Sequence, residues 1–545
     1  MRHLLLLPLL LAGMPGYAAD HIDDLIAQGR AQLDKGDTVG ALEFFDQADA
    51  EEDGALRTRM WVLRAHFEQG AQIMDAFDEV DALASKNEGP DLDYLYGMGS
   101  YFKAKKYMSE GVQDNTVRFA MGDAQGFLAK ATSADAKKYY DAWYPLAEAA
   151  WMNQDPGAAL LAVEQAVEVR PEDPAVRFLH GRILFSLYTA TKAEDEEAAA
   201  KRLDASIVAF GDVLDLLGEP KHHAAMAAEA LKQLAIAQQW KGETDAAIES
   251  YAASIGWDPN IHDYGTYWTS LELEGFIGML EQAAANYTSN YGADNSGDAT
   301  MLWWLGSAYH SASKYEECEA TYLKVAEKWP AYTNSWFYVG ISRYFREDYD
   351  GAIEAWHENW KADATDLVRS IQSNQQLYLD IVSFVIGKCA EKGQPPGRKG
   401  EYNVKAAFLA EVRCAVDGEN WVFWNDWGLF ARDGGAFLAR RNSKPADKKT
   451  AQDLFEAAWS AYAEAMKLAP DKPHLYNDAA VILQYYLERD YDRAFELYDE
   501  AYALAAEQLE AGNLSEEDRA LAELAKRDSK NNSAALKKKI EDDGK

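Results

Sequence analysis

Apolar residues recur every three or four positions along almost the whole chain, and runs that alternate apolar with polar residues are missing. The first pattern is typical of helices that bury one face, whereas the second would indicate strands. Proline and glycine fall mainly between the helical stretches, where they end helices and form turns. The sequence therefore predicts an all-α protein.

One helical pattern repeats along the chain. Residues 298–332 predict two helices, and the second of them ends before Pro330. Five positions of this unit carry residues of the same kind 34 residues later: Leu302 and Trp336, Leu305 and Val339, Gly306 and Gly340, Cys318 and Ala352, and Tyr322 and Trp356. A single pair of helices cannot bury its apolar faces alone, so repeated pairs are expected to stack.

This pattern resembles the tetratricopeptide repeat family, in which a large residue, Leu and Gly on a first helix precede small and aromatic residues on a second helix and then a proline. Units with the same spacing span 22–55, 140–173, 228–261, 421–472 and a stretch from Pro473. Degenerate or lengthened pairs are expected at 56–92, 93–132, 174–220, 262–298 and 367–420. The resemblance implies an α-solenoid of stacked antiparallel helix pairs over most of residues 22–506.

The chain divides into four parts on these criteria. Residues 1–18 predict a secretory signal peptide, residues 19–261 an N-terminal array and residues 262–506 a Trp-rich C-terminal array. Residues 507–545 contain no aromatic side chain and open with a capping box at Ser515 and Asp518. They predict a polar helix that caps the array and then frays.

The signal peptide determines the expected compartment. Arg2 precedes an apolar stretch that is too short to span a bilayer, and Gly16 and Ala18 suit a cleavage site. The mature chain is expected to begin at Ala19 or Asp20, in the periplasm or outside a bacterial cell. No later apolar run is long enough to predict a transmembrane helix.

Charge and cysteine content exclude several classes. The formal charge of −36 over 545 residues argues against nucleic acid as a partner. Three cysteines, Cys318, Cys389 and Cys414, are too few for a disulfide-framework fold. A bridge between Cys389 and Cys414 is disfavoured because their predicted positions differ by about 15 Å along two helices.

The sequence contains no motif of a known catalytic centre, so no enzyme activity, metal or cofactor is expected. His222, His223 and Glu229 would need further ligands to hold a metal. Asp294, Ser296 and Asp298 begin like a calcium loop, but the glycine and glutamate that such a loop requires are replaced. Carboxylates are too abundant to identify a glycosidase pair.

Tryptophan is concentrated in one part of the chain, and 13 of the 16 residues lie between positions 240 and 459. Most of them are expected to fill packing positions, and the remainder to form an aromatic binding surface. The resemblance implies that particular places of each first helix line a concave face. In this sequence those places hold Tyr144, Trp151, Lys232, Gln239, Trp240, Trp303, His310, Asn334, Phe337, Tyr344, Phe345, Asn425, Arg432, Asn477, Gln484 and Tyr485.

Two basic islands interrupt the acidic background. The first includes Arg398 and Lys399, and the second includes Arg440 and Arg441. Both fall in predicted turns within successive helix pairs, so they could form one anion-binding patch. The alternative is that they relieve charge repulsion in solvated loops.

These observations favour an exported scaffold or adaptor that binds a peptide or protein partner on its concave face. The chaperone-binding subtype of the family is excluded, because Ile236 replaces the asparagine that would accompany Lys232. A glycan-binding or glycan-cleaving α/α protein is the alternative, suggested by the abundant tryptophan and carboxylate residues. The 34-residue spacing favours the first interpretation.

Overall fold

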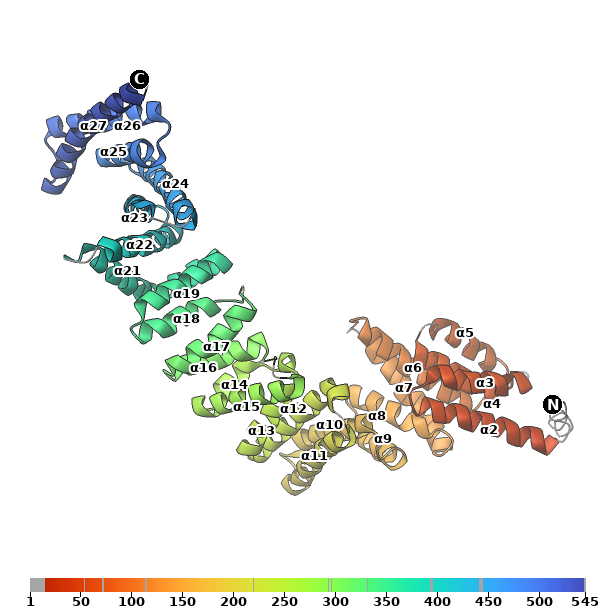
Figure 1. Ribbon diagram of the computed structural model, residues 1–545. Helices are drawn as coiled ribbons and strands as arrows, with labels where there is room; N and C mark the ends of the chain where they lie inside the picture. The colour runs from red at the N-terminus through yellow and green to blue at the C-terminus, as the bar shows by residue number, and fades with distance from the viewer. Residues whose placement is uncertain are drawn as a thin grey trace, which may run out of the picture. The chain divides into compact units, whose positions relative to one another are not determined.

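The computed structural model shows helices that follow one another in antiparallel pairs (Figure 1). It describes residues 15–543 except for 53, 71–72, 113–114, 219, 293, 296, 331, 393–395 and 441–444. Within those residues every regular element is helical and no strand occurs. The predicted fold class, an all-α solenoid of tetratricopeptide-like helix pairs, is confirmed. Most of the predicted signal peptide lies outside the described residues.

The chain forms two compact units, one comprising Met1–Asp263 with Glu281–Asn295 and the other Tyr264–Leu280 with Ser296–Lys545. The helices of the first unit are α2 (Pro15–Leu33), α3 (Thr38–Glu51), α4 (Leu56–Gln69), α5 (Ile73–Ala84), α6 (Pro90–Ser109), α7 (Asn115–Ala134), η1 (Tyr140–Ala142), α8 (Trp143–Met152), α9 (Pro156–Val169), α10 (Pro174–Thr191), α11 (Glu196–Leu216), η2 (Pro220–His223), α12 (Ala224–Lys241), α13 (Thr244–Trp257) and η3 (Pro259–Ile261). Helix α15 (Leu273–Tyr291) contributes to both units.

The second unit contains the more regular pairs and the longer helices. Its elements are α14 (Tyr264–Ser270), α16 (Ala299–Ser311), α17 (Tyr315–Lys328), α18 (Ser335–Phe345), α19 (Tyr349–Ala362), α20 (Ala364–Ser373), α21 (Gln375–Ala390), α22 (Pro396–Val416), α23 (Trp421–Arg440), α24 (Pro445–Leu468), α25 (Pro473–Val481), the π-helical turn η4 (Ile482–Leu487), α26 (Tyr491–Ala511) and α27 (Glu516–Asp543).

Aspartate side chains fix the start of many helices. Asp155, Asp298 and Asp348 each precede a helix and accept a hydrogen bond from a backbone N–H of its first turn. These N–H groups have no partner within the helix, so each cap satisfies a donor that would otherwise need water. The caps explain why the repeats keep their boundaries in a chain so rich in helix-forming residues.

A glycine on the first helix of a pair faces an aromatic ring on the second. A β-carbon at Gly306 would lie 2.7 Å from the ring of Tyr322, and one at Gly428 would lie 2.8 Å from the ring of Tyr462. Gly340 faces Trp356 in the same way. The rings of Tyr322, Trp356 and Tyr462 are completely buried. The repeated glycine therefore permits the close approach of helices that buries these rings, as the sequence pattern predicted.

Helix α27 closes the C-terminal end. Ser515 caps the start of this helix, with the Asp518 N–H donating to Ser515 Oγ at 3.1 Å and the Ser515 hydroxyl donating to the Asp518 carboxylate at 2.8 Å. Leu536 is buried against α25 and α26, and Lys539 pairs with Glu488 at 2.7 Å. The helix extends to Asp543.

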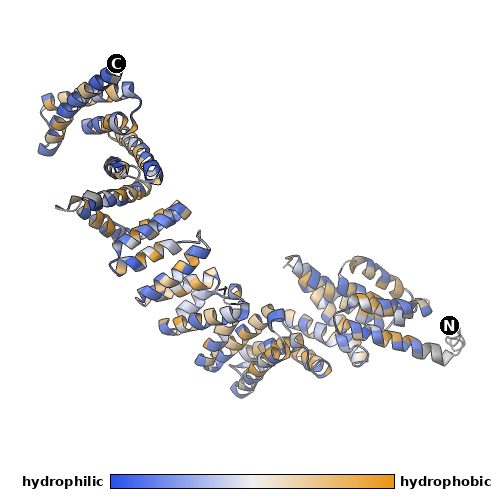
Figure 2. Ribbon diagram, in the orientation of Figure 1, coloured by the Kyte–Doolittle hydropathy of each residue, from blue (hydrophilic) through white to orange (hydrophobic). Residues whose placement is uncertain are grey.

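Apolar and polar residues are mixed along the helices (Figure 2). Among the described residues, no helix combines the length and the apolar character required to cross a membrane. The three cysteines are buried free thiols.

Candidate functional site

An aromatic surface extends over the first helices α16 and α18, which the resemblance assigns to the concave face, and includes Tyr315 at the start of α17. It consists of Trp303, His310, Tyr315, Tyr338, Tyr344 and Phe345, and is called the aromatic surface below. His310 lies 5.5 Å from the ring of Tyr338 and 5.9 Å from that of Phe345. Phe345 is 44% exposed and stacks on Tyr315 at 4.7 Å. The structure therefore brings together four of the predicted binding residues: Trp303, His310, Tyr344 and Phe345.

Hydrogen bonds fix one end of the aromatic surface. The indole N–H of Trp303 donates to Asn334 Oδ1 at 2.8 Å, and the backbone N–H of Asn334 donates to Asp366 Oδ2 at 2.8 Å. Asn334 adopts a left-handed conformation, with φ of 44°, immediately before α18. Asn334 thus links residues of three successive helix pairs, and its bond to the indole holds the Trp303 ring in a defined orientation.

The other end is fixed by a tyrosine–carboxylate contact. The Tyr344 hydroxyl donates to Asp380 Oδ2 on α21 at 2.7 Å. This hydrogen bond raises the pKa of Tyr344 to about 12, so the phenol remains neutral at physiological pH. Tyr344 therefore offers a ring face to a ligand, while its polar end is already bonded.

His310 is the central residue of the aromatic surface. Burial lowers its pKa, because the rings around it disfavour the charged imidazolium. Its Nδ1 atom is buried and has no hydrogen-bond partner in the described residues. His310 therefore contributes mainly an uncharged ring, and the surface has little charge of its own.

Two residues of α18 differ from the predicted arrangement. Phe337 was expected on the concave face but is 2% exposed, whereas Trp336 was expected in the core but is only half-buried. The Phe337 ring stacks on Trp356 at 5.7 Å, and the Trp356 indole donates to the Phe337 carbonyl at 3.3 Å. Because Trp356 fills the space beside Gly340, the core of this pair recruits Phe337, and its predicted exposure is wrong.

The predicted residues farther along the second unit do not form a comparable surface. Asn477 is 7% exposed and bonds to Asp478 and Asn532, so its predicted place on an open face is wrong. Helix α27 covers this position, which the repeat pattern does not anticipate. Arg432 is held by Asp433 at 2.9 Å. Asn425 is half-buried on α23, and Tyr485 is 48% exposed in η4.

Two predicted binding residues of the first unit, Trp151 and Trp240, each contact one cationic side chain. Trp151 lies under the guanidinium of Arg182 at 4.1 Å. Trp240 is 49% exposed and lies under the Lys192 ammonium at 3.9 Å. Trp151 and Trp240 lie on different helix pairs, on α8 and α12, so the two indoles do not form one surface.

A pocket of about 190 Å³ lies between the first helices α2, α4, α6 and α8. Arg30 lies over the rings of Trp61 and Tyr140, at 4.6 Å and 4.3 Å. Buried Arg64 pairs with Glu68 at 2.6 Å and with Asp141 at 3.2 Å. The pocket thus combines aromatic walls with arginine and carboxylate groups, and is called the arginine pocket below.

The arginine pocket was not predicted from the sequence, although a signal was present. Arg30 and Arg64 are 34 residues apart and occupy the same place in successive units. That place is one of those that line the concave face in the resembled family. A repeat-aligned comparison of charged residues would therefore have found both.

The structure does not bring the two basic islands into a defined site. Arg398 and Lys399 are exposed near the start of α22, and Arg440 is exposed at the end of α23. Arg441 lies outside the described residues. A group of three or more His, Cys, Asp or Glu side chains arranged to hold a metal is absent from the residues that the structure describes.

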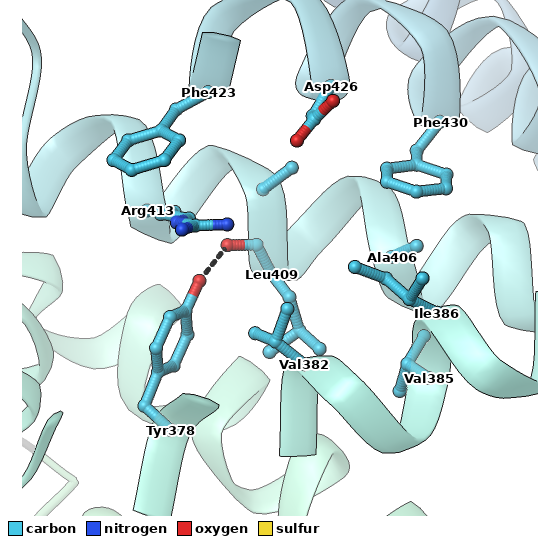
Figure 3. Close-up of a pocket in the computed structure, with 11 residues that line it drawn as sticks. Tyr378, Val382, Val385, Ile386, Ala406, Leu409, Arg413, Phe423, Asp426 and Phe430 are labelled. Atoms are coloured by element: carbon cyan, nitrogen blue, oxygen red, sulfur yellow. Dashed lines mark hydrogen bonds between the residues drawn. The ribbon is translucent and has the colours of Figure 1, made fainter. Parts of the chain in front are cut away.

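A small cavity between α21, α22 and α23 is shown in Figure 3. Its volume is about 20 Å³, which is enough for one water molecule. Arg413 lies 3.7 Å from the ring centroid of Phe423, and the Tyr378 hydroxyl donates to the Leu409 carbonyl at 2.5 Å (Figure 3). This cavity is a packing gap and not a ligand site.

Comparison with known proteins adds only distant structural similarity. No family model and no curated protein matches the chain. The TPR domain of P58(IPK) is 15% identical, covers 80% of this chain and 99% of its own, and gives a TM-score of 0.20. Cut9–Hcn1 of the APC/C is 12% identical, with coverages of 94% and 97% and a TM-score of 0.25. The C-terminal part of a TPR repeat-containing protein from Cytophaga hutchinsonii is 12% identical, with coverages of 52% and 98% and a TM-score of 0.26.

At TM-scores this low, the similarity says nothing about the function of the chain. The repeat architecture rests on its own helix pairs, and above all on the glycine–aromatic contacts at Gly306, Gly340 and Gly428.

Proposed function

We propose that the protein is an exported, non-catalytic scaffold that binds an extended segment of a partner protein on the aromatic surface. The observation that carries the proposal is the group of uncharged rings on two successive first helices, with Trp303 and Tyr344 held by hydrogen bonds. Side chains that are already ordered lose little entropy on binding, and large aromatic residues often dominate the energy of an interface.

The spacing of the rings suggests how the segment would lie. Neighbouring packed helices are separated by about 8–10 Å, and an extended chain advances about 3.3 Å per residue. A segment that crosses from α16 to α18 would therefore place an apolar side chain at about every third residue. Its polar backbone would face Asn334 and the remaining edge groups.

The test is peptide selection against the purified mature protein, followed by binding measurements with a triple variant. Replacement of Trp303, Tyr344 and Phe345 by Ala should abolish binding of the selected peptides, because each large anchor is worth about 2 kcal/mol or more in an interface. Trp336→Ala is the matched control, since Trp336 is also aromatic, half-buried and on α18. Retained binding by a triple variant with native circular dichroism would refute the proposed surface.

Export is tested separately. The predicted cleavage site leads us to expect a mature chain that begins at Ala19 or Asp20 in the envelope or medium of the host cell. N-terminal sequencing of the protein purified from each cell fraction measures this. An intact chain found only in the cytoplasm would contradict export without affecting the binding proposal.

The arginine pocket favours a second candidate, glycan binding. Sugar rings stack on aromatic faces, and their hydroxyl groups bond to planar arginine and carboxylate groups of the kind that Arg30, Arg64 and Asp141 provide. A glycan array probed with the mature protein tests this function. Signals that disappear in Arg30→Ala would support it, and a blank array would reject it.

A further inference from the structure

A second pocket lies on the opposite set of helices from the aromatic surface. Its volume is about 270 Å³, and it lies where the second helices α19, α22 and α24 meet, with one residue from α23. Its walls are largely apolar and include Ile353, Phe408, Trp427 and Leu454. It is called the second-helix pocket below.

The pocket arises where the repeat becomes irregular. Phe408 packs with the apolar cluster that contains Trp356, whereas Trp427 and Leu454 pack with the cluster that contains Tyr462. The pocket is thus the gap between two parts of the apolar core. Helix α22 has 21 residues and α24 has 24, compared with 14 in α19. The longer second helices extend beyond the pattern that fills the regular pairs.

An unpaired carboxylate lines this apolar gap. Glu411 is half-buried and makes no ion pair or hydrogen bond with any residue that the structure describes. Desolvation raises the pKa of the Glu411 carboxyl group. A carboxylate placed in apolar surroundings without a partner is unfavourable, and a cation that binds there would remove that cost.

The nearby cation of the chain is already occupied. Lys405 also lines the pocket, but its ammonium group pairs with Asp350 at 2.6 Å. Glu354, at the exposed edge of the pocket, is likewise without an ion pair in the described part of the chain. His357 also lines the pocket, 4.8 Å from the ring of Phe408, and burial lowers its pKa, which favours the neutral imidazole. The charge left for a ligand is therefore negative.

We infer that the second-helix pocket binds a lysine or arginine side chain of a partner protein, with the cationic group at Glu411 and the aliphatic stem against Phe408 and Trp427. The aromatic rings attract a cation through their faces and cover the stem. The cavity of about 270 Å³ has room for one long side chain. The chain's formal charge of −36 also favours a basic partner.

The experiment is a ligand-observed NMR titration of the mature protein with defined probes. The first probe is the blocked peptide acetyl-Gly-Leu-Lys-Leu-Gly-amide, and its counterpart carries Nε-acetyllysine at the central position. We expect the lysine peptide to bind at least about tenfold more tightly, because acetylation removes the charge that Glu411 would pair with. Equal affinity of the two peptides would overturn the inference.

Variants locate the site. Glu411→Gln removes the charge at nearly constant shape and should weaken binding of the lysine peptide by at least about tenfold. Ala457→Trp fills the pocket without changing its charge and should also abolish binding. Glu419→Gln, an exposed position between α22 and α23 that does not line the pocket, is the matched control and should leave affinity unchanged. Undiminished binding by Glu411→Gln would overturn the assignment.

Two further arms separate this inference from its alternatives. n-Butylamine presents the same ammonium group without a peptide. If it binds as tightly as the peptide, the site recognises a free amine, and the inference that its ligand is a side chain of a partner protein is overturned. The triple variant of Trp303, Tyr344 and Phe345 should bind the lysine peptide normally. If it does not, the peptide is bound on the aromatic surface and the second-helix pocket is not its site.

Discussion

The pairs α16–α19 and the helices α20–α24 belong to the same unit but differ in regularity. The four helices of the first region have 11 to 14 residues. In the second region α22, α23 and α24 have 20 to 24 residues. The regular region carries the aromatic surface on its first helices, whereas the lengthened region contains the Figure 3 cavity and contributes most of the second-helix pocket.

The difference shows what the 34-residue period achieves. When two helices have matched lengths, a residue of one pair meets a residue of the same kind in each successive pair, and the core fills completely. Extra helical turns present side chains for which the period provides no partner. Regularity therefore stabilises the array, and departures from it create sites such as the one at Glu411.

Trp356→Ala, in the regular region, is expected to cause the largest loss of stability. Trp356 is completely buried in the regular region between Gly340 and Phe337. Its removal should cost about 3–5 kcal/mol as a large-to-small core substitution. The melting temperature measures this loss. Trp336→Ala, which removes a half-buried indole from the adjacent helix, should cost much less. Similar losses for the two variants would contradict the observed packing of α18.

Gly306→Leu tests whether close helix contact is the basis of regularity. The new side chain would overlap the ring of Tyr322, because even a β-carbon would lie 2.7 Å from it. We expect a loss of about 1–3 kcal/mol from overpacking, visible as a lower melting temperature. An unchanged melting temperature would show that the pair can separate without cost, and would remove the physical explanation of the repeat.

Gly387→Ala is the counterpart in the lengthened region. It should increase the free energy of unfolding, whereas Gly306→Leu should decrease it. Gly387 lies within α21, and a β-carbon there would have no neighbour within 4 Å. Alanine in place of a helix-interior glycine usually stabilises by about 0.5–1 kcal/mol. Gly306→Ala is the matched control and should destabilise, since the same methyl group would meet Tyr322. Chemical denaturation of the two alanine variants measures the change in the free energy of unfolding. If both variants are stabilised, or both destabilised, the expected contrast between the two glycines is contradicted.

The sequence predicted those features that depend on the period alone. Gly306 and Gly340 each precede their aromatic partner by 16 residues, the spacing that the repeat dictates, whereas the inserted loop separates Gly428 from Tyr462 by 34 residues. The assignment of Phe337 and Trp336 failed because it required knowledge of the helix face to within one residue. That face depends on the left-handed turn at Asn334, which the period does not specify, and on the size of Trp356, where the period specifies only an aromatic residue.

The pockets were harder to predict for a different reason. The second-helix pocket combines Ile353, Glu411, Trp427 and Leu454 from four helices. Their juxtaposition depends on how much longer α22 and α24 are than the second helix of a regular pair. The sequence pattern predicted an insertion but not the lengths of these helices. Composition shows an excess of carboxylates but cannot identify one that lacks a partner, which requires the geometry around Glu411.

The smallest expected effect concerns His310 in the regular region. Burial lowers its pKa, and its neighbours Tyr315, Tyr338 and Phe345 provide no charge that would stabilise an imidazolium. The unfolded chain, in which histidine has a pKa of about 6.5, therefore binds a proton more readily than the folded chain. Stability from this residue should be complete above about pH 6.5 and decline as the pH falls below it.

His310→Phe tests this linkage, because phenylalanine keeps the ring contacts and removes both the titrating group and the unpartnered Nδ1. The variant should melt near the wild-type temperature at about pH 7.5 and above it at about pH 5.5. Thermal melts followed by circular dichroism at the two pH values measure the difference. If acid destabilises both proteins equally, protonation of His310 does not oppose folding, and the acid sensitivity lies outside the aromatic surface. A smaller acid-induced loss in the variant would show that the uncharged character of this surface is maintained by its packing, since the same rings that exclude water from His310 are those proposed to receive the apolar side chains of a partner.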